Sequence, residues 1–364
     1  MKNIRILTFW NVPNYGAFMQ AYALQKFLEN RYADCNVNQL SHLAQCHYDA
    51  YYKLKTRKNY KLWYINPKFY IRFLKRTKLI RELENTKKFL SYYDSIPHTD
   101  INDDRIDVLV LGSDIIWDYN IDVFGCDQKL FGIGINAKKK ISYAPGFGTV
   151  KLGMSAPEYV KKGLNELDAI SVRDEKSKKI VKDLTGKDAA VVIDPTLLWN
   201  FENDENIPEP SLSHDYIVVY GSYFTKELVD GAQKYCRDNN CKLICLSSLD
   251  DKYDWCDEVV DQNNLDPFEW VGYFKHAKAV MTCTYHGLMF GLIFKKRIVF
   301  NMTEFILEKS ESLIEELGIR EVLVDFKSFD EKMNWNWDYK NIYMNIENLR
   351  CNSFKYLDGV INNE

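Results

Sequence analysis

The sequence predicts an α/β protein of two domains, each built around a parallel sheet. Short apolar runs alternate with segments of helical period along most of the chain, which is the pattern of βαβ units. The length of 364 residues suits two domains. Between the two series lies 200–214, an acidic, proline-containing segment without apolar period, which we interpret as a linker. Two such sheets would face a cleft at the carboxyl ends of their strands, where open α/β folds bind ligands.

The first domain, residues 1–199, is expected to begin with a β-rich strand at 4–9. Apolar residues then recur at helical spacing after the turn at 11–16, which predicts a helix. Further strands are predicted at 107–111, 141–144, 169–172 and 189–193. Asp174 is placed to open a helix after the strand at 169–172.

The second domain, residues 215–345, repeats this alternation. Strands are predicted at 216–220, 242–247, 279–283 and 297–300, with helices at 226–239, 267–277 and 286–294. The two series share no internal repeat of short period.

Composition excludes several classes of protein. Lys and Arg total 48 against 51 Asp and Glu, a net charge of −3, so the chain does not coat nucleic acid with its whole surface. Phosphate-binding P-loops, zinc-protease helices and serine-hydrolase elbows have no match. The start of the chain reads as a strand and not as a signal peptide, and the longest apolar tract, 279–294, falls short of a membrane span.

Cysteine usage predicts a reducing compartment. The nine cysteines are scattered and contain no CxxC pair, so a cytoplasmic location is expected. The group Cys35, His42, Cys46 and His47 has no standard zinc spacing, and no metal is expected.

The segment 51–90 breaks the charge balance. It carries thirteen Lys and Arg against two acids, interleaved with nine aromatic residues. Such a segment suits an anionic membrane surface at the inner face of the membrane, or nucleic acid. The alternative is a solvated helical insertion whose aromatics pack on the first domain.

Candidate ligand-binding residues lie at the ends of predicted strands. Asn14, Tyr15, Gly16 and Gln20 follow the first strand, where free N–H groups at a helix start suit an anion or a hydroxyl. The alternative is an ordinary Asn/Gly turn.

A second group follows the strand at 107–111. The carboxylate of Asp114, with Ser113, could bind sugar hydroxyls while the indole of Trp117 covers a sugar face. The alternative is a helix cap followed by a core tryptophan.

Two cationic candidates complete the set. Arg173 follows a strand and could clamp phosphate or carboxylate, or it could pair with Asp174 or Glu175. His286 lies between a buried strand and an apolar helix, so its imidazole is expected at a helix N-terminus that faces the interdomain cleft. A lone histidine can also be structural.

Seven collinear segments resemble motifs of one family, the polysaccharide pyruvyl transferases. They are NYGAFMQAYALQ (14–25), VLGSDIIW (110–117), ISYAPGFG (141–148), ISVRDEKS (170–177), VIDPTLL (192–198), TYHGLMFGLIFKKRIV (284–299) and LRCNSFKYL (349–357). Two departures stand out: Thr284 replaces an arginine that some members carry, and Pro145-Gly146 replaces a pair of small residues.

The resemblance implies a glycosyltransferase-B-like fold of two Rossmann-like domains, with a C-terminal helix at 346–364 that crosses back to the first domain. It implies transfer of pyruvate from phosphoenolpyruvate to sugar hydroxyls as a ketal, on a free or lipid-linked acceptor for a cell-surface polysaccharide or exopolysaccharide, without metal, organic cofactor or nucleic acid. It adds Asp194, Thr284 and Gly287 to the substrate-binding set.

The chemistry of that reaction suggests roles for three residues. His286 is the candidate general acid or phosphate partner, Arg173 the anion clamp, and Asp114 the hydroxyl binder and candidate base. Two alternatives stay open: a nucleotide-sugar glycosyltransferase of the same architecture, and a non-catalytic glycan-binding member of the family.

Overall fold

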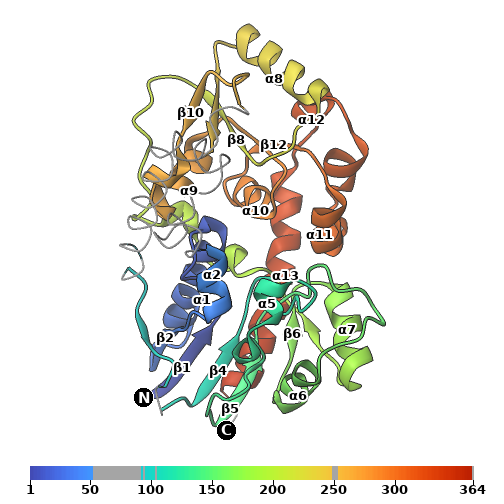
Figure 1. Cartoon of the computed structure of the whole chain (residues 1–364). Coiled ribbons are helices and arrows are strands. Elements are labelled where there is room, and N and C mark those ends of the chain that lie inside the picture. Colours follow the sequence, from blue (N-terminus) through green and yellow to red (C-terminus); the bar gives the residue numbers. More distant parts are fainter. Residues whose placement is uncertain (52–91, 93–94, 103–104, 248–252, 363–364) are drawn as a thin grey trace, which may run out of the picture.

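A computed structural model describes residues 1–51, 92, 95–102, 105–247 and 253–362. These residues form two parallel five-stranded sheets, at the two ends of the molecule in Figure 1. The first has the order β3-β2-β1-β4-β5 and the second β10-β9-β8-β11-β12. In each sheet the strand order reverses once, between β1 and β4 or between β8 and β11. The predicted fold class is confirmed.

The strands are short, and the central ones are largely buried. Those of the first sheet are β1 (Lys2–Leu7), β2 (Cys35–Ser41), β3 (His98–Asp100), β4 (Val108–Leu111) and β5 (Lys139–Ser142). Those of the second are β8 (Tyr216–Tyr220), β9 (Lys242–Leu246), β10 (Glu258–Val260), β11 (Ala279–Thr282) and β12 (Arg297–Phe300). A small pair, β6 (Ser171–Val172) and β7 (Ala190–Val191), is tied to β5 by a bridge between Ile141 and Ala169. All four residues of β4 are buried, as expected of a parallel strand covered on both faces.

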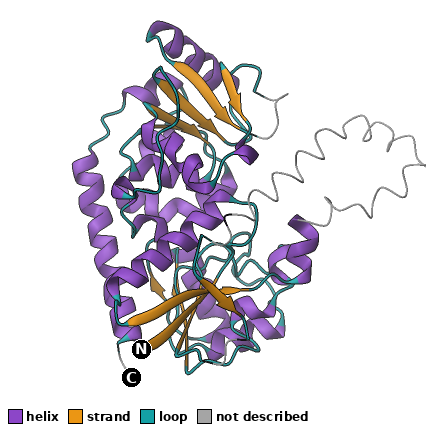
Figure 2. Ribbon diagram, turned by 90° about the vertical axis from the view of Figure 1, so that its left-hand side faces the viewer, coloured by secondary structure: helices purple, strands orange, loops and turns teal. Residues whose placement is uncertain are grey.

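Helices cover the sheets and fill the space between them (Figure 2). The α-helices are α1 (Tyr15–Arg31), α2 (Gln45–Tyr51), α5 (Asp122–Gly125), α6 (Glu158–Glu166), α7 (Glu175–Thr185), α8 (Lys226–Asp238), α9 (Pro267–His276), α10 (Tyr285–Ile293), α11 (Glu304–Leu317), α12 (Phe329–Asn334) and α13 (Tyr339–Ile361). Shorter turns are η3 (Gln128–Phe131), η4 (Pro195–Leu197), η5 (Phe201–Asn203), η7 (Gln262–Asn264) and the π-helical η8 (Glu321–Asp325). Within the described ranges, no helix is both long and apolar enough to cross a bilayer.

The last helix joins the two domains. α13 runs from the second domain down to the first, where the C-terminus lies near the N-terminus (Figure 1). Near its end, Lys2 Nζ donates a hydrogen bond to the Ile361 carbonyl at 2.7 Å, and the Ile193 N–H donates to Ser353 Oγ at 3.0 Å. The expected return of the C-terminal helix is confirmed, and the helix begins at Tyr339, before the expected 346.

A second contact holds the domains together on the side of α1. The Tyr15 hydroxyl donates to the Leu265 carbonyl at 3.0 Å, and its ring stacks on Trp270 with centroids 5.7 Å apart. Tyr22 donates to the Asp204 carboxylate at 2.9 Å, so the segment predicted as a linker packs against α1. The domains therefore meet through buried aromatic residues as well as through α13.

The basic aromatic segment 51–90 lies outside the described residues, except for Tyr51 at the end of α2. Its insertion between α2 and β3, and its contact with a membrane, stay predictions.

Candidate active site

Strand ends of both domains converge on one cavity of about 140 Å³. The first domain contributes the segments after β1, β4 and β6, and the second contributes the start of α10 and one side of α11. The lining residues are Phe9, Val12, Asn14, Ala17, Asp114, Ile115, Phe124, Arg173, Tyr285, His286 and Lys309. The structure thus brings together Asn14, Asp114, Arg173 and His286, which the sequence analysis had singled out on four separate segments.

Arg173 is buried between the two domains. Its Nη1 lies 3.2 Å from Asp194 Oδ2, and the centre of its guanidinium lies 4.4 Å from the centroid of the Tyr285 ring. The alternative of an ion pair with Asp174 or Glu175 is replaced by this pair with Asp194. Within the described part of the chain, the buried Nε of Arg173 has no hydrogen-bond partner. A fixed cation with an unused donor is suited to hold an anion.

His286 is the second residue of α10, and its ring packs against Gly16 at the start of α1. A β-carbon on Gly16 would lie 2.1 Å from His286 Nδ1, so the imidazole fits only because position 16 has no side chain. Burial, together with Arg173 and Lys309, lowers the pKa of His286, although Asp194 and Asp114 raise it. Burial therefore favours the neutral ring in the free protein. Its buried Nε2 has no hydrogen-bond partner among the described residues.

Lys309 is a cavity residue that the sequence analysis missed. It comes from α11, and its Nζ lies 3.6 Å from the centroid of the Phe305 ring. Burial and the nearby Arg173 lower its pKa to about 8. In the sequence this lysine stands among the glutamates of α11 and looks like a solvated helical residue, so no local signal marks it.

Asp114 lies where the chain turns after β4, with φ of 68°. Its Oδ1 accepts a hydrogen bond from the Ile115 N–H at 2.8 Å, and its backbone carbonyl accepts from the Gly146 N–H at 2.8 Å. These contacts hold the carboxylate at the cavity wall. Asn14, on the same wall, caps α1 by accepting the Ala17 N–H at 3.2 Å.

The expected sugar-binding role of Trp117 is wrong. Its side chain is fully buried, its Nε1 donates to the Leu130 carbonyl at 3.0 Å, and its ring stacks on Phe131 with centroids 5.9 Å apart. The tryptophan therefore belongs to the core of the first domain, which was the alternative interpretation.

Three further predicted binding residues, Ser113, Gln20 and Tyr15, do not line the cavity and hold neighbouring segments in place. Ser113 Oγ donates to Gln20 Oε1 at 2.7 Å, and Gln20 Nε2 donates to the Phe9 carbonyl at 3.1 Å. Because both side chains are fully buried, they fix the ends of β1 and β4 and do not reach the cavity. Tyr15 likewise serves the domain contact and is not a cavity residue.

The residues added by the family resemblance are positioning residues. Asp194 accepts from Thr196 Oγ1 at 2.7 Å and holds Arg173 with its other oxygen. Thr284 Oγ1 caps α10 by accepting the Gly287 N–H at 3.1 Å. A β-carbon on Gly287 would lie 2.2 Å from Thr282 Oγ1, so this glycine allows the tight start of α10 that presents His286.

Comparisons with known proteins identify the family of the chain. A family model described as "Polysaccharide pyruvyl transferase" matches residues 14–300. No curated protein has significant sequence similarity to the chain.

Solved structures show the fold. A putative UDP-N-acetylglucosamine 2-epimerase from Listeria monocytogenes is 9% identical, with 100% of this chain and 98% of that chain covered and a TM-score of 0.53. UGT71G1 from Medicago truncatula, solved with UDP-glucose, is 12% identical, with 99% and 98% covered and a TM-score of 0.46. A UDP-GlcNAc 2-epimerase from Methanocaldococcus jannaschii is 11% identical, with 97% and 100% covered and a TM-score of 0.44. The likeness to the Listeria protein supports a glycosyltransferase-B-like fold.

Proposed function

The chain belongs to the polysaccharide pyruvyl transferase family, and from this premise we propose that it transfers the pyruvyl group of phosphoenolpyruvate to sugar hydroxyls. The observation that carries this proposal is the cavity between the domains. There Arg173, His286 and Lys309, from three separate segments, line one space. Arg173 Nε and His286 Nε2 are buried there without a hydrogen-bond partner among the described residues.

The charges of the cavity suit phosphoenolpyruvate, which carries a carboxylate and a phosphate ester on the same carbon, C2. Arg173 is held by Asp194 and Tyr285, so its guanidinium is fixed before any ligand arrives. Lys309 supplies a second cation, although burial disfavours its charged form. Two cations in a partly buried site attract a trianion far more strongly than they would in bulk water.

The reaction needs a proton at C3 of phosphoenolpyruvate. Protonation there makes C2 electrophilic, and a sugar hydroxyl oxygen forms a bond to C2. The C2–O bond to phosphate then breaks, and a second hydroxyl of the same acceptor closes the ketal. One hydroxyl proton replaces the proton delivered to C3, and the other leaves with inorganic phosphate.

His286 is the proposed proton donor or phosphate partner. Although burial lowers its pKa in the free protein, a bound phosphate would raise that pKa, because a nearby opposite charge favours the protonated ring. Binding of phosphoenolpyruvate would thus favour uptake of a proton from solvent by His286, the residue proposed to donate it. Asp114, which also lines the cavity, is the proposed partner of the attacking hydroxyl.

The acceptor is proposed to be a sugar of a cell-surface polysaccharide precursor, free or lipid-linked. No cofactor is proposed for this transfer. Two alternatives are a nucleotide-sugar transferase and a non-catalytic binder. Analysis of the reaction products distinguishes them, because the first would transfer a sugar and the second would form no product.

Mass spectrometry of reactions with carbon-13-labelled phosphoenolpyruvate tests the proposal. Free and lipid-linked oligosaccharides serve as acceptors, and UDP- and GDP-sugars replace phosphoenolpyruvate in parallel reactions. We expect an acceptor to gain one labelled pyruvate with loss of one water, together with inorganic phosphate. Glycosyl transfer from a nucleotide sugar, without any labelled product, would show that the donor is wrong.

A further inference from the structure

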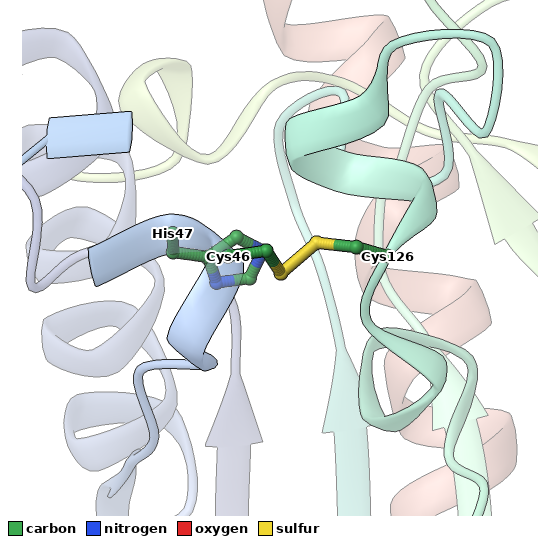
Figure 3. Close-up of side chains that lie close together, drawn as sticks. All are labelled: Cys46, His47 and Cys126. Atoms are coloured by element: carbon green, nitrogen blue, oxygen red, sulfur yellow. A yellow bond between two sulfur atoms is a disulfide. The ribbon is translucent and has the colours of Figure 1, made fainter. Parts of the chain in front are cut away.

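A cluster beside the cavity contains two cysteines and a histidine, of which the histidine is buried and Cys126 is exposed. Cys46 and His47 are neighbours in α2, and Cys126 immediately follows α5 (Figure 3). The two cysteines form a disulfide with Cα atoms 6.5 Å apart, and 80 residues separate them in sequence. One ligand atom from each of the three residues lies within 4.8 Å of the other two.

His47 has an unused nitrogen in this cluster. The residue is 2% exposed, and its Nε2 has no hydrogen-bond partner in the part of the chain that the structure describes. The ring hydrogen-bonds to the backbone of Val123. A buried imidazole nitrogen without a partner costs free energy. Histidines that bind metal characteristically hydrogen-bond to a backbone carbonyl or a carboxylate with one ring nitrogen and leave the other for the ion.

A carboxylate lies just outside the cluster. Asp127 Oδ2 is 3.9 Å from His47 Nδ1 and 2.8 Å from His42 Nε2. Asp127 is itself 5% exposed. An acid in this position orients the imidazole and offsets the positive charge of a bound cation.

We propose that Cys46, Cys126 and His47 bind a divalent metal ion of zinc type when the two cysteines are reduced. Two thiolates and one imidazole are ligands that zinc prefers, and a water molecule can take the fourth position. The disulfide must first take two electrons and two protons from a thiol reductant, and each thiol then loses its proton to bind the ion. No metal was expected from the sequence, because Cys35, His42, Cys46 and His47 have no standard zinc spacing.

The metal site would stabilise the part of the cavity wall formed by Phe9 and Phe124. The Phe9 ring lies 4.5 Å from the His47 ring and 4.8 Å from the Phe124 ring, measured between centroids. Phe9 and Phe124 both line the cavity. A metal ion at the cluster would therefore hold α2 and α5 together and fix this wall, independently of which donor the enzyme uses.

Cobalt substitution tests this proposal. The full chain is reduced with a phosphine under anaerobic conditions, its nine thiols are counted, and Co²⁺ is titrated into it. We expect one Co²⁺ per chain, with the visible bands of tetrahedral cobalt and a near-ultraviolet thiolate-to-cobalt charge-transfer band. Zn²⁺ should displace the ion and remove these bands.

Variants assign the ligands. Cys46→Ser and Cys126→Ser should abolish the charge-transfer band, and His47→Gln should weaken binding at least about tenfold. Cys351→Ser changes an exposed free cysteine and should leave the spectrum unchanged. Circular dichroism checks that each variant is folded. The proposal would be overturned if the reduced protein lacked these bands or if the bands survived in both cysteine variants. It would also be overturned if the Cys46–Cys126 disulfide could not be reduced.

Discussion

Gly16 and His286, which come from different domains, are in close contact where His286 lines the cavity. A β-carbon on Gly16 would lie 2.1 Å from Nδ1 and 2.5 Å from Cγ of His286. The first turn of α1 therefore sets the position of the histidine that α10 presents. Glycine is required at position 16 because a side chain there would clash with His286, and not because of the backbone conformation.

Gly16→Ala should displace His286 and reduce turnover by about 10²-fold or more, since an ångström of misplacement can cost that much. The matched control is Gly359→Ala in α13, where a β-carbon would have no atom within 4 Å. Steady-state kinetics and thermal melting of both variants give the comparison. Normal turnover in a folded Gly16→Ala protein would show that the position of His286 is unimportant.

His286→Ala should lower turnover by about 10² to 10⁴, the usual contribution of a positioned acid or base. His286→Gln separates two roles, because glutamine donates a hydrogen bond but cannot supply a proton. Partial rescue by glutamine indicates a phosphate partner, and no rescue indicates a general acid. If the folded alanine variant keeps near-normal rates, the histidine is structural.

Lys309→Met should stabilise the free protein while it weakens phosphoenolpyruvate binding. The pKa of Lys309 falls from 10.5 to about 8 because of burial, so its charge destabilises the folded state. We expect a gain of about 1–3 kcal/mol in the free energy of unfolding at pH 7. The penalty is fully present below pH 8 and disappears as the pH rises from 8 to 10.5, because the folded state loses its proton first.

Denaturant unfolding at pH 7 and pH 10 measures this difference. Lys332→Met is the control for binding, since Lys332 has a similarly lowered pKa of about 8 but donates to the Val322 carbonyl, away from the cavity. It should leave the affinity for phosphoenolpyruvate unchanged. A Lys309→Met protein that is less stable than the wild type at pH 7 would contradict the claim that the charge of Lys309 destabilises the folded state.

The segment 51–90 should bind anionic membranes. Each basic residue near such a surface contributes about 1 kcal/mol, so several must face it together. Sedimentation with vesicles of anionic and of neutral lipid at low salt measures the preference, and reversal at high salt is the control. Equal sedimentation with both kinds of vesicle would contradict membrane binding and favour the alternative, a solvated insertion whose aromatic residues pack on the first domain.

Much of the fold could be predicted because the central strands are continuous apolar runs. The strands β8 and β12 have the predicted bounds, and β4 and β11 differ by one residue. The strand β2, which lies between β3 and β1, was missed because its sequence, CNVNQLS, mixes polar and apolar residues. Its Gln39 is fully buried and donates to the Ala21 carbonyl at 3.1 Å, a contact that no periodicity reveals.

The site was predictable only where a strand end marks it. Asp114, Arg173 and His286 each follow a strand, and all three line the cavity. Trp117 also follows a strand, but the direction of a side chain after a turn depends on the backbone there and cannot be derived from spacing. Lys309 reaches the cavity only when the two domains pack together, so its local sequence does not predict that it lines the cavity.

The most direct test of the central claim is a calorimetric titration of phosphoenolpyruvate into the wild-type chain and into Arg173→Lys, with UDP-N-acetylglucosamine as a second titrant. Lysine keeps the charge of Arg173 but loses the planar guanidinium that rests on Tyr285, so binding should weaken about tenfold or more. The proposed function predicts one phosphoenolpyruvate per wild-type chain and no heat from the nucleotide sugar. Phosphoenolpyruvate that gives no heat with or without acceptor, or that binds both proteins equally, would contradict it.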